Sequence, residues 1–223
     1  MTSQLSLTEE NYIKAIYQIS LDPTTNVSTN ALADNMQTKP ATVSDMIKKL
    51  SKKKLLIYEK YKGVSLSKSG LSTALTIVRK HRLWEVFLVN HLNFKWDEVH
   101  EIAEQLEHII SPELVERLDR FLGNPRIDPH GDPIPDINGN FHCGPTHLLS
   151  ELAIMEIGVI IGVKNDDPLL LQYLDKVNIR LGLKIKILEI NTYDGSVKIE
   201  INEVGKIFLS EKITSQLLIS KTS

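Results

Sequence analysis

The sequence predicts a multidomain protein, mainly α with β, in which an N-terminal winged helix-turn-helix precedes a helical domain and a small C-terminal β-barrel. Three short helical patterns followed by two strand patterns fill the first seventy residues, and strand patterns return only after Leu148. With 223 residues, 42% of them hydrophobic and 24% charged, the chain can bury several cores. We place the domain boundaries at 1–72, 73–143 and 148–223.

The first two helices are marked by apolar residues at helical spacing. Tyr12 and Ile16 belong to the first helix, which ends at Asp22 and Pro23. The segment VSTNALADNM then predicts a short second helix with Ser28 and Thr29 as capping candidates and with an apolar face for the core.

A third helix and a hairpin complete the N-terminal pattern. PATVSDMIKKLSKKK begins with Pro40, a residue suited to a first helical turn, and its apolar positions are Val43, Met46, Ile47 and Leu50. The strands LLIYEK and VSLS, separated by a turn at Tyr61, Lys62 and Gly63, predict the wing. A winged helix lays its third helix in the major groove of double-stranded DNA.

Charge supports a polyanionic partner. Between Lys39 and Lys68 nine lysines face two acidic residues, a local balance of +7 in a chain whose net charge is −2. A lysine run alone is more often a solvated helix face, but here it coincides with the predicted recognition helix. We expect base contacts from Lys39, Thr42, Ser44 and Asp45, and phosphate contacts from Lys48, Lys49 and Lys62.

The stretch from His81 to His108 holds four of the seven histidines and sets them among carboxylates at helical spacing. Two faces are predicted, one with His81 and Glu85 and the other with His100, Glu104, Glu107 and His108. Six such ligands could hold two ions, although spacing alone also fits a salt-bridged helix surface. The single cysteine, Cys143, excludes a paired thiolate site. We expect no metal site from His130, His142, Cys143 and His147.

The remaining apolar residues predict cores. Leucines, isoleucines and phenylalanines at helical spacing between Leu83 and Leu118 indicate a helical core and dimer seam. Beyond Leu148, the runs LAIMEIGVIIGV, LKIKILEI, VKIEIN and KIFLS predict strands, with a turn at 193–196 and a short helix in DDPLLLQYLDK.

Ordered motifs give the chain a family resemblance. TEENYIKAIY, PATVSDMIKKL, LSKSG, RKHRLWEVFLV, VHEIAEQLEHIIS, VERLDRFLGNP and PHGDPIP follow one another along nearly the whole length. In these motifs the chain resembles the diphtheria toxin repressor and manganese transport regulator family of metal-dependent transcription factors. The resemblance implies a helical dimerisation domain, an SH3-like C-terminal domain, and a homodimer that represses metal-uptake genes at palindromic operators.

The same resemblance implies two ligand sets. The primary, activating ion would be held by Asn11, Glu104, Glu107 and His108. The ancillary ion would be held by His81, Glu85, His100 and Asp166.

One position departs from the family pattern. Asn11 stands where manganese-responsive members have aspartate and iron-responsive members have methionine, so either the affinity for metal drops, or Glu10 or water takes over. Glu104 stands where the iron-responsive branch has cysteine, and hard carboxylate ligands suit Mn²⁺ and Fe²⁺. We therefore favour Mn²⁺ as the cofactor, with Fe²⁺ as the alternative.

The sequence leaves three alternative functions open. An iron-responsive repressor of the same family is the nearest, followed by a regulator that senses an organic ligand and by a helical-bundle metalloenzyme. Because the His-to-Glu spacing of the helical stretch differs from that of di-iron bundles, we do not expect an enzyme. The N-terminus lacks a signal-peptide pattern, and the expected location is cytoplasmic with no membrane partner.

Overall fold

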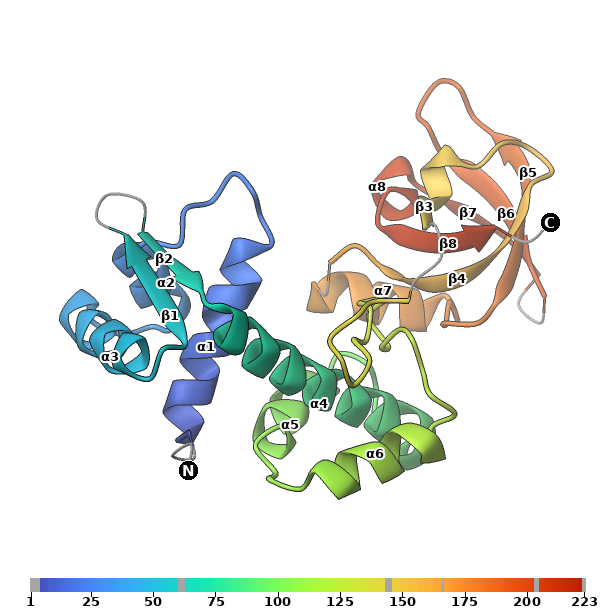
Figure 1. Ribbon diagram of the computed structural model, residues 1–223. Helices are drawn as coiled ribbons and strands as arrows, with labels where there is room; N and C mark the ends of the chain where they lie inside the picture. Colours follow the sequence, from blue (N-terminus) through green and yellow to red (C-terminus); the bar gives the residue numbers. More distant parts are fainter. Residues whose placement is uncertain (1–4, 60–62, 143–145, 166, 203–204, 222–223) are drawn as a thin grey trace. The chain divides into compact units, whose positions relative to one another are not determined.

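The computed structural model forms two compact units that share the long helix α4 (Figure 1). Unit 1 comprises Met1–His81, Leu106–Ile110 and Pro135–Asn140. Unit 2 comprises Arg82–Gln105, Ser111–Ile134 and Phe141–Ser223. The structure describes residues 5–59, 63–142, 146–165, 167–202 and 205–221.

Unit 1 begins with the predicted winged helix-turn-helix. Its elements are α1 (Leu7–Ser20), α2 (Thr29–Asn35), α3 (Pro40–Lys52), β1 (Leu56–Glu59), β2 (Gly63–Leu66) and the first half of α4 (Lys68–Leu92). Ser28 caps α2 by accepting the Ala31 N–H at 3.1 Å, and Pro40 is the first residue of α3, so both sequence signals are confirmed.

The core of unit 1 lies between these helices and the hairpin. Val43, Ile47 and Leu50 of α3 are buried as predicted, whereas Met46 is half-buried and packs at the edge of the core. Further buried members come from α1, α2, the hairpin and α4: Tyr12, Ile13, Ile16, Leu32, Leu56, Val64, Ala74 and Ile77. The turn of the wing, including Lys62, lies outside the described residues.

Glu9 of α1 forms ion pairs with two lysines at the C-terminal end of α3. The carboxylate of Glu9 is 2% exposed, and its Oε1 lies 2.6 Å from the Lys53 Nζ and 3.3 Å from the Lys49 Nζ. Burial by itself raises the pKa of this carboxyl, but the hydrogen bonds from Lys53, the Ser6 backbone and Lys49 outweigh it and lower the pKa of Glu9 to about 2. Glu9 is therefore ionised at neutral pH.

Two further helices follow α4, namely α5 (Val99–Leu106) and α6 (Pro112–Phe121). The sequence pattern placed His100, Glu104, Glu107 and His108 on one continuous helix, and this is wrong in part because α5 ends at Leu106. Ser111 is extended and caps α6, whose first residue is Pro112, so the chain must leave the helical conformation before that point. Glu107 and His108 consequently lie in a turn.

The C-terminal part of unit 2 is one antiparallel sheet with the strand order β3-β8-β4-β5-β6-β7 (Figure 1). The elements are β3 (His147–Leu148), η1 (Leu149–Glu151), β4 (Ile157–Val163), α7 (Pro168–Lys176), β5 (Lys184–Ile190), β6 (Val197–Ile201), β7 (Gly205–Leu209), α8 (Glu211–Thr214) and β8 (Leu217–Lys221). The predicted helix in DDPLLLQYLDK is confirmed as α7. The run LAIMEIGVIIGV is a strand only from Ile157, because a turn at Ile154 and Met155, the latter with a positive φ (72°), interrupts its first half.

Two apolar cores stabilise unit 2. The larger one is formed by side chains of the sheet and of α7. Its almost completely buried members include Ile160, Leu171, Leu174, Ile185, Ile199, Leu217 and Ile219. The smaller one joins α4 to α6 through Leu83, Val86 and Leu118. It also includes Ile134 of the segment between α6 and β3, which we call the connector. Of the helices that the structure describes, none is long and apolar enough to cross a membrane.

A pair of glycines brings the connector against the sheet. The Val163 N–H donates to the His130 carbonyl at 2.7 Å, and a Cβ added to Gly162 would lie 2.1 Å from the Gly131 Cα. Since no side chain fits between the two backbones, glycine is required here for close approach.

We predict that Gly162→Ala destabilises unit 2 by about 3 kcal/mol, because the added methyl group must push the connector off β4. Gly182→Ala is the control, since Gly182 has a positive φ (82°) but open space around its Cβ position. Urea unfolding of the two variants measures the difference. Because Gly162 does not have a positive φ, a destabilisation no larger than that of Gly182→Ala, which introduces backbone strain alone, would contradict the close-approach role of Gly162.

Candidate metal centre

Glu107 is a completely buried carboxylate at the centre of unit 1. Its Oε2 accepts a hydrogen bond from the Lys14 ammonium of α1 at 2.7 Å, and it lies 2.6 Å from the His81 Nδ1 of α4. A buried carboxylate is strongly disfavoured without a cation, and this position has a lysine and an imidazole on one oxygen.

The partners of Glu107 keep it ionised. Burial by itself raises the pKa of this carboxyl, but the hydrogen bond from His81 and the charge of Lys14 outweigh burial, and the pKa of Glu107 is lowered. The carboxylate is therefore anionic at neutral pH, as a metal ligand must be.

His108 is oriented by the residue that follows Glu9 on α1. The His108 Nδ1 lies 2.6 Å from the Glu10 Oε2, and the His108 Nε2 lies 3.9 Å from the Glu107 Oε1. When Nδ1 carries the proton and donates to Glu10, Nε2 retains its lone pair. Carboxylates fix metal-binding histidines in this way, so Glu10 has the geometry of an orienting residue.

Two buried oxygen atoms of the predicted primary ligands have no hydrogen-bond partner among the residues that the structure describes. They are the Glu107 Oε1 and the Asn11 Oδ1. A buried acceptor without a donor costs free energy unless something else satisfies it. Oxygen atoms of a carboxylate and an amide, together with one imidazole nitrogen, are the donors that Mn²⁺ and Fe²⁺ accept, so the residues present fit a divalent cation.

A second lysine lies near the same carboxylates. Lys80 of α4 is 7% exposed, and burial lowers its pKa although Glu10 and Glu107 act in the opposite direction. Sequence reasoning missed both Lys14 and Lys80. Lys14 could have been found, because it lies one helical turn after Glu10 and Asn11, between the apolar Ile13 and Ala15.

Unit 2 holds its own group of ligand-type side chains around Glu85. This carboxylate is 2% exposed, with its Oε1 3.5 Å from the His100 Nδ1 and its Oε2 3.6 Å from the His130 Nδ1. The His100 Nε2 lies 3.5 Å from the Glu104 Oε1 on the same face of α5. His100 and Glu104 are thus one helical turn apart, as their spacing predicts.

Asp128 and His130 join this group, although the sequence pattern predicted no ligand role for them. Glu85, Asp128 and His130 each offer an atom within 4.8 Å of the others. Burial and the neighbouring Glu85 raise the pKa of Asp128 to about 7. Burial lowers the pKa of His130, but Glu85 and Asp128 outweigh it and raise that pKa to about 9. His130 therefore lies beside Glu85 and Asp128, a grouping that the sequence pattern did not predict, while the expectation of no metal site from His130, His142, Cys143 and His147 stays a prediction.

The predicted ligands are distributed over both units. Asn11, His81, Glu107 and His108 belong to unit 1, whereas Glu85, His100 and Glu104 belong to unit 2. Within unit 1, Glu107 is brought to His81 and His108; within unit 2, Glu85 is brought to His100. His81 and Glu85 are one turn apart on α4, and Asp166 lies outside the described residues.

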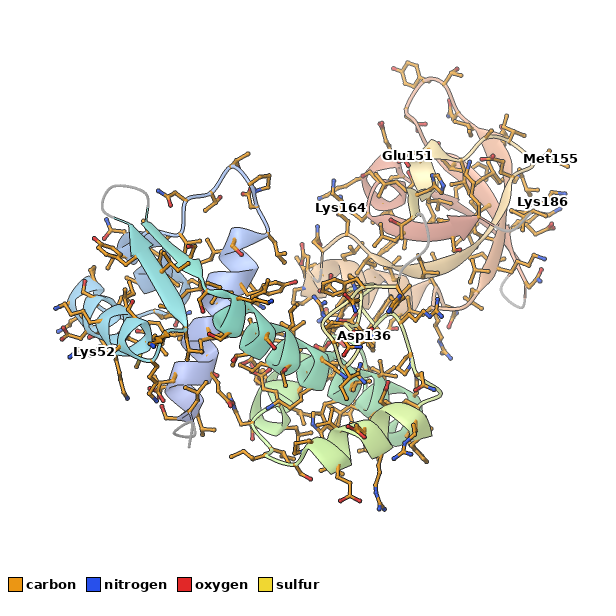
Figure 2. All side chains as sticks on the ribbon, viewed as in Figure 1. Lys52, Asp136, Glu151, Met155, Lys164 and Lys186 are labelled. Atoms are coloured by element: carbon orange, nitrogen blue, oxygen red, sulfur yellow. The ribbon has the colours of Figure 1, made fainter. Side chains whose placement is uncertain are left out.

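The predicted DNA contacts lie on and beside α3. Lys39 and Thr42 are exposed, and Ser44 is half-buried and donates its hydroxyl to the Pro40 carbonyl at 3.0 Å. Asp45 and Lys48 form an exposed pair at 3.1 Å. Lys52 also lies on this helix (Figure 2) and is exposed, which adds to the basic surface.

Comparisons with known proteins assign the chain to a family. Residues 4–64 match the iron dependent repressor N-terminal DNA binding domain, residues 67–136 its metal binding and dimerisation domain, and residues 147–221 the FeoA domain. The structure matches a manganese-dependent transcriptional repressor in complex with manganese, with a TM-score of 0.73, 32% identity, and coverage of 96% of this chain and 100% of that chain. The chain belongs to the diphtheria toxin repressor and manganese transport regulator family.

Other members of this family show the range of similarity. The manganese regulator SloR is 35% identical, with a TM-score of 0.63 over 96% of this chain and 98% of that one. The iron-dependent repressor IdeR of Mycobacterium tuberculosis is 31% identical over 60% of this chain, and the match spans 58% of IdeR. The diphtheria toxin repressor of Corynebacterium diphtheriae is 26% identical over 82% of this chain and 84% of its own length.

We predict that Lys14→Met destabilises the protein by about 3 kcal/mol at neutral pH, because Glu107 loses a buried cation. The loss shrinks as the pH falls, since a protonated Glu107 no longer needs Lys14. Urea unfolding at several pH values measures this trend. A destabilisation that does not depend on pH would contradict the electrostatic role of Lys14.

Proposed function

We propose that this protein is a manganese-activated transcriptional repressor of metal-uptake genes that binds palindromic operator DNA as a homodimer. The observation that carries the proposal is that two predicted ligand atoms, Glu107 Oε1 and Asn11 Oδ1, are buried without a hydrogen-bond partner among the described residues, while Glu10 orients the imidazole of His108. They belong to the same unit as the winged helix.

The primary ion would be held by Asn11, Glu104, Glu107 and His108. Among the alternatives that the sequence left open for Asn11, we favour direct ligation by its amide oxygen, because the carboxylate of Glu10 is already engaged by His108. Glu10 then orients His108 from outside the ligand set. This division gives the adjacent residues Glu10 and Asn11 different tasks.

The ancillary ion would be held by His81, Glu85, His100 and Asp166, which gives two ions per subunit. Support comes from Glu85, a buried carboxylate that already has two imidazoles beside it, those of His100 and His130. His81 would serve this site through its Nε2, because Glu107 engages only its Nδ1. The carboxylate of Glu107 would then orient this imidazole.

Manganese is favoured by the donors and by the relatives. The ligand set contains oxygen and imidazole nitrogen without thiolate, which suits a hard divalent cation. Two of the similar structures are a manganese-dependent repressor with manganese and the manganese regulator SloR. An iron-responsive repressor is the second candidate, favoured by the match to the iron-dependent repressor of Mycobacterium tuberculosis.

The DNA contacts would come from α3 and the wing. Lys39, Thr42, Ser44 and Asp45 would reach base edges, and Lys48, Lys49 and Lys62 would meet phosphates. Asn11 of α1 and Glu107 and His108 after α5 would hold the ion together, and its positive charge would neutralise the carboxylates. Because metal and DNA affinities are coupled reciprocally, a tenfold gain in operator affinity requires about 1.4 kcal/mol of coupling.

We expect His108→Ala to remain folded and dimeric but to lose metal-enhanced operator binding, because it removes the imidazole ligand without unpairing Lys14. Fluorescence anisotropy of a labelled operator, titrated with Mn²⁺, Zn²⁺, anaerobic Fe²⁺ and a chelator, measures the effect. His147→Ala in the C-terminal sheet is the control and should behave as the wild type. If Mn²⁺ enhanced operator binding by His108→Ala as much as by the wild type, the assignment of His108 to the primary site would be wrong.

Asn11→Asp should increase the affinity for Mn²⁺ by about tenfold or more, because a carboxylate replaces a neutral amide oxygen among the ligands. Isothermal titration calorimetry with Mn²⁺ measures this directly. An affinity equal to that of the wild type would indicate that residue 11 does not ligate the ion.

Lys48→Gln and Lys49→Gln should each weaken operator binding for all sequences and lower the slope of log K against log salt by about one. Lys164→Gln is the control, because Lys164 is an exposed lysine of the C-terminal sheet domain (Figure 2). A salt slope that stays the same for Lys48→Gln and Lys49→Gln would rule out their phosphate contacts.

A further inference from the structure

Glu9 is a buried carboxylate that neither ligand set uses. It lies in the first turn of α1 and completes a capping box, in which its Oε2 accepts the Ser6 N–H at 2.8 Å and its own N–H donates to the Ser6 Oγ at 3.3 Å. One oxygen of Glu9 therefore fixes the start of α1.

The other oxygen of Glu9 holds the end of the recognition helix. Oε1 lies 2.6 Å from the Nζ of Lys53, the residue that caps the C-terminus of α3, and 3.3 Å from the Nζ of Lys49. Lys53 is one-quarter exposed, whereas Lys49 is more than half exposed. The Lys53 contact is thus the shorter and better shielded one, and Lys49 remains accessible to a phosphate.

The residues after Glu9 lead directly to the metal centre. The Glu10 Oε2 lies 2.6 Å from the His108 Nδ1, and the Asn11 Oδ1 is a buried acceptor without a hydrogen-bond partner among the described residues. Three consecutive residues of one helical turn therefore contact the recognition helix, orient a metal ligand and offer a ligand atom. A movement of this turn therefore displaces both the contact of Glu9 with α3 and the side chains of Glu10 and Asn11, because a helical turn moves as a rigid body.

We propose that Glu9 is the positioning residue through which the metal centre acts on the recognition helix, because its carboxylate ties Lys53 of α3 to the turn of α1 that carries Glu10 and Asn11. This inference rests on the proposed function. Glu9 would not bind the ion or DNA. Through its contact with Lys53, the position of α1 determines the position of α3.

The buried contact of Glu9 differs in its geometry from an ordinary ion pair at the surface. Exposed ion pairs contribute little, about 0–1 kcal/mol, and hold no fixed direction. Glu9 is 2% exposed and uses both oxygens, one on α1 and one on α3, so its direction is fixed by two elements. The Glu113 and Arg117 pair of α6, at 2.6 Å with both side chains about 70% exposed, offers the contrasting case.

The test uses Glu9→Gln in the full chain, because glutamine keeps the size and the acceptor for Ser6 but removes the charge. Calorimetry with Mn²⁺ should give an affinity within about twofold of the wild type. Operator anisotropy with and without Mn²⁺ should show that the metal-dependent enhancement falls by about tenfold. A merely stabilising role would lower the unfolding midpoint and leave this ratio unchanged, which would overturn the inference.

Lys53→Met supplies the second variant and carries the same test if Glu9→Gln does not fold. Because the two side chains act as one contact, the double variant should lose no more of the enhancement than either single variant. Additive losses would overturn the route through Lys53. Glu113→Gln is the matched control and should leave both metal affinity and enhancement unchanged.

The two hypotheses fail in different ways. If the wild type shows no metal enhancement, the proposed function is overturned together with this inference. If the wild type responds to Mn²⁺ and Glu9→Gln responds equally, only the role of Glu9 is overturned.

Discussion

The buried carboxylate of Glu107 is the constraint on which unit 1 depends. It is completely buried and ionised, so polar partners must surround it, and they are the Lys14 ammonium of α1 and the His81 imidazole of α4. These contacts fix the turn after α5 against two helices of the N-terminal head. Only one carboxylate oxygen is used for this, and the other remains an acceptor next to His108. Structural pairing and, in the proposed function, metal ligation would therefore be two tasks of a single side chain.

Helix α1 connects the chemistry of the site to the DNA-binding head. Its first turn begins with a capping box and places Glu9, Glu10 and Asn11 in succession. Each has a different partner or task, and none could change position without moving the others, because helical geometry fixes their relative directions. The coupling that a metal-dependent repressor requires can thus be contained in very few residues.

Local sequence signals were sufficient for most of the elements. Ser28, Pro40 and the apolar spacing of α1 to α3 predicted the helices, and the alternation in VKIEIN predicted a strand, because caps and hydrophobic periods act within a few residues. The identities and spacing of Glu107, His108, Glu85 and His100 also indicated metal ligands. The signal failed at the end of α5, where the cap of the next helix overrides a helical period.

The sequence by itself determined the fold class, the helical and strand segments, the family and the ligand types, because each depends on neighbouring residues or on ordered motifs. Tertiary structure decided which groups meet. Lys14 and Glu107 are 93 positions apart, and nothing local in either segment shows that they will pair. The grouping of His130 with Glu85 and the contact of Glu9 with Lys53 arise in the same way. A buried charge selects its partner only once packing has excluded water, and that exclusion is a property of the folded chain.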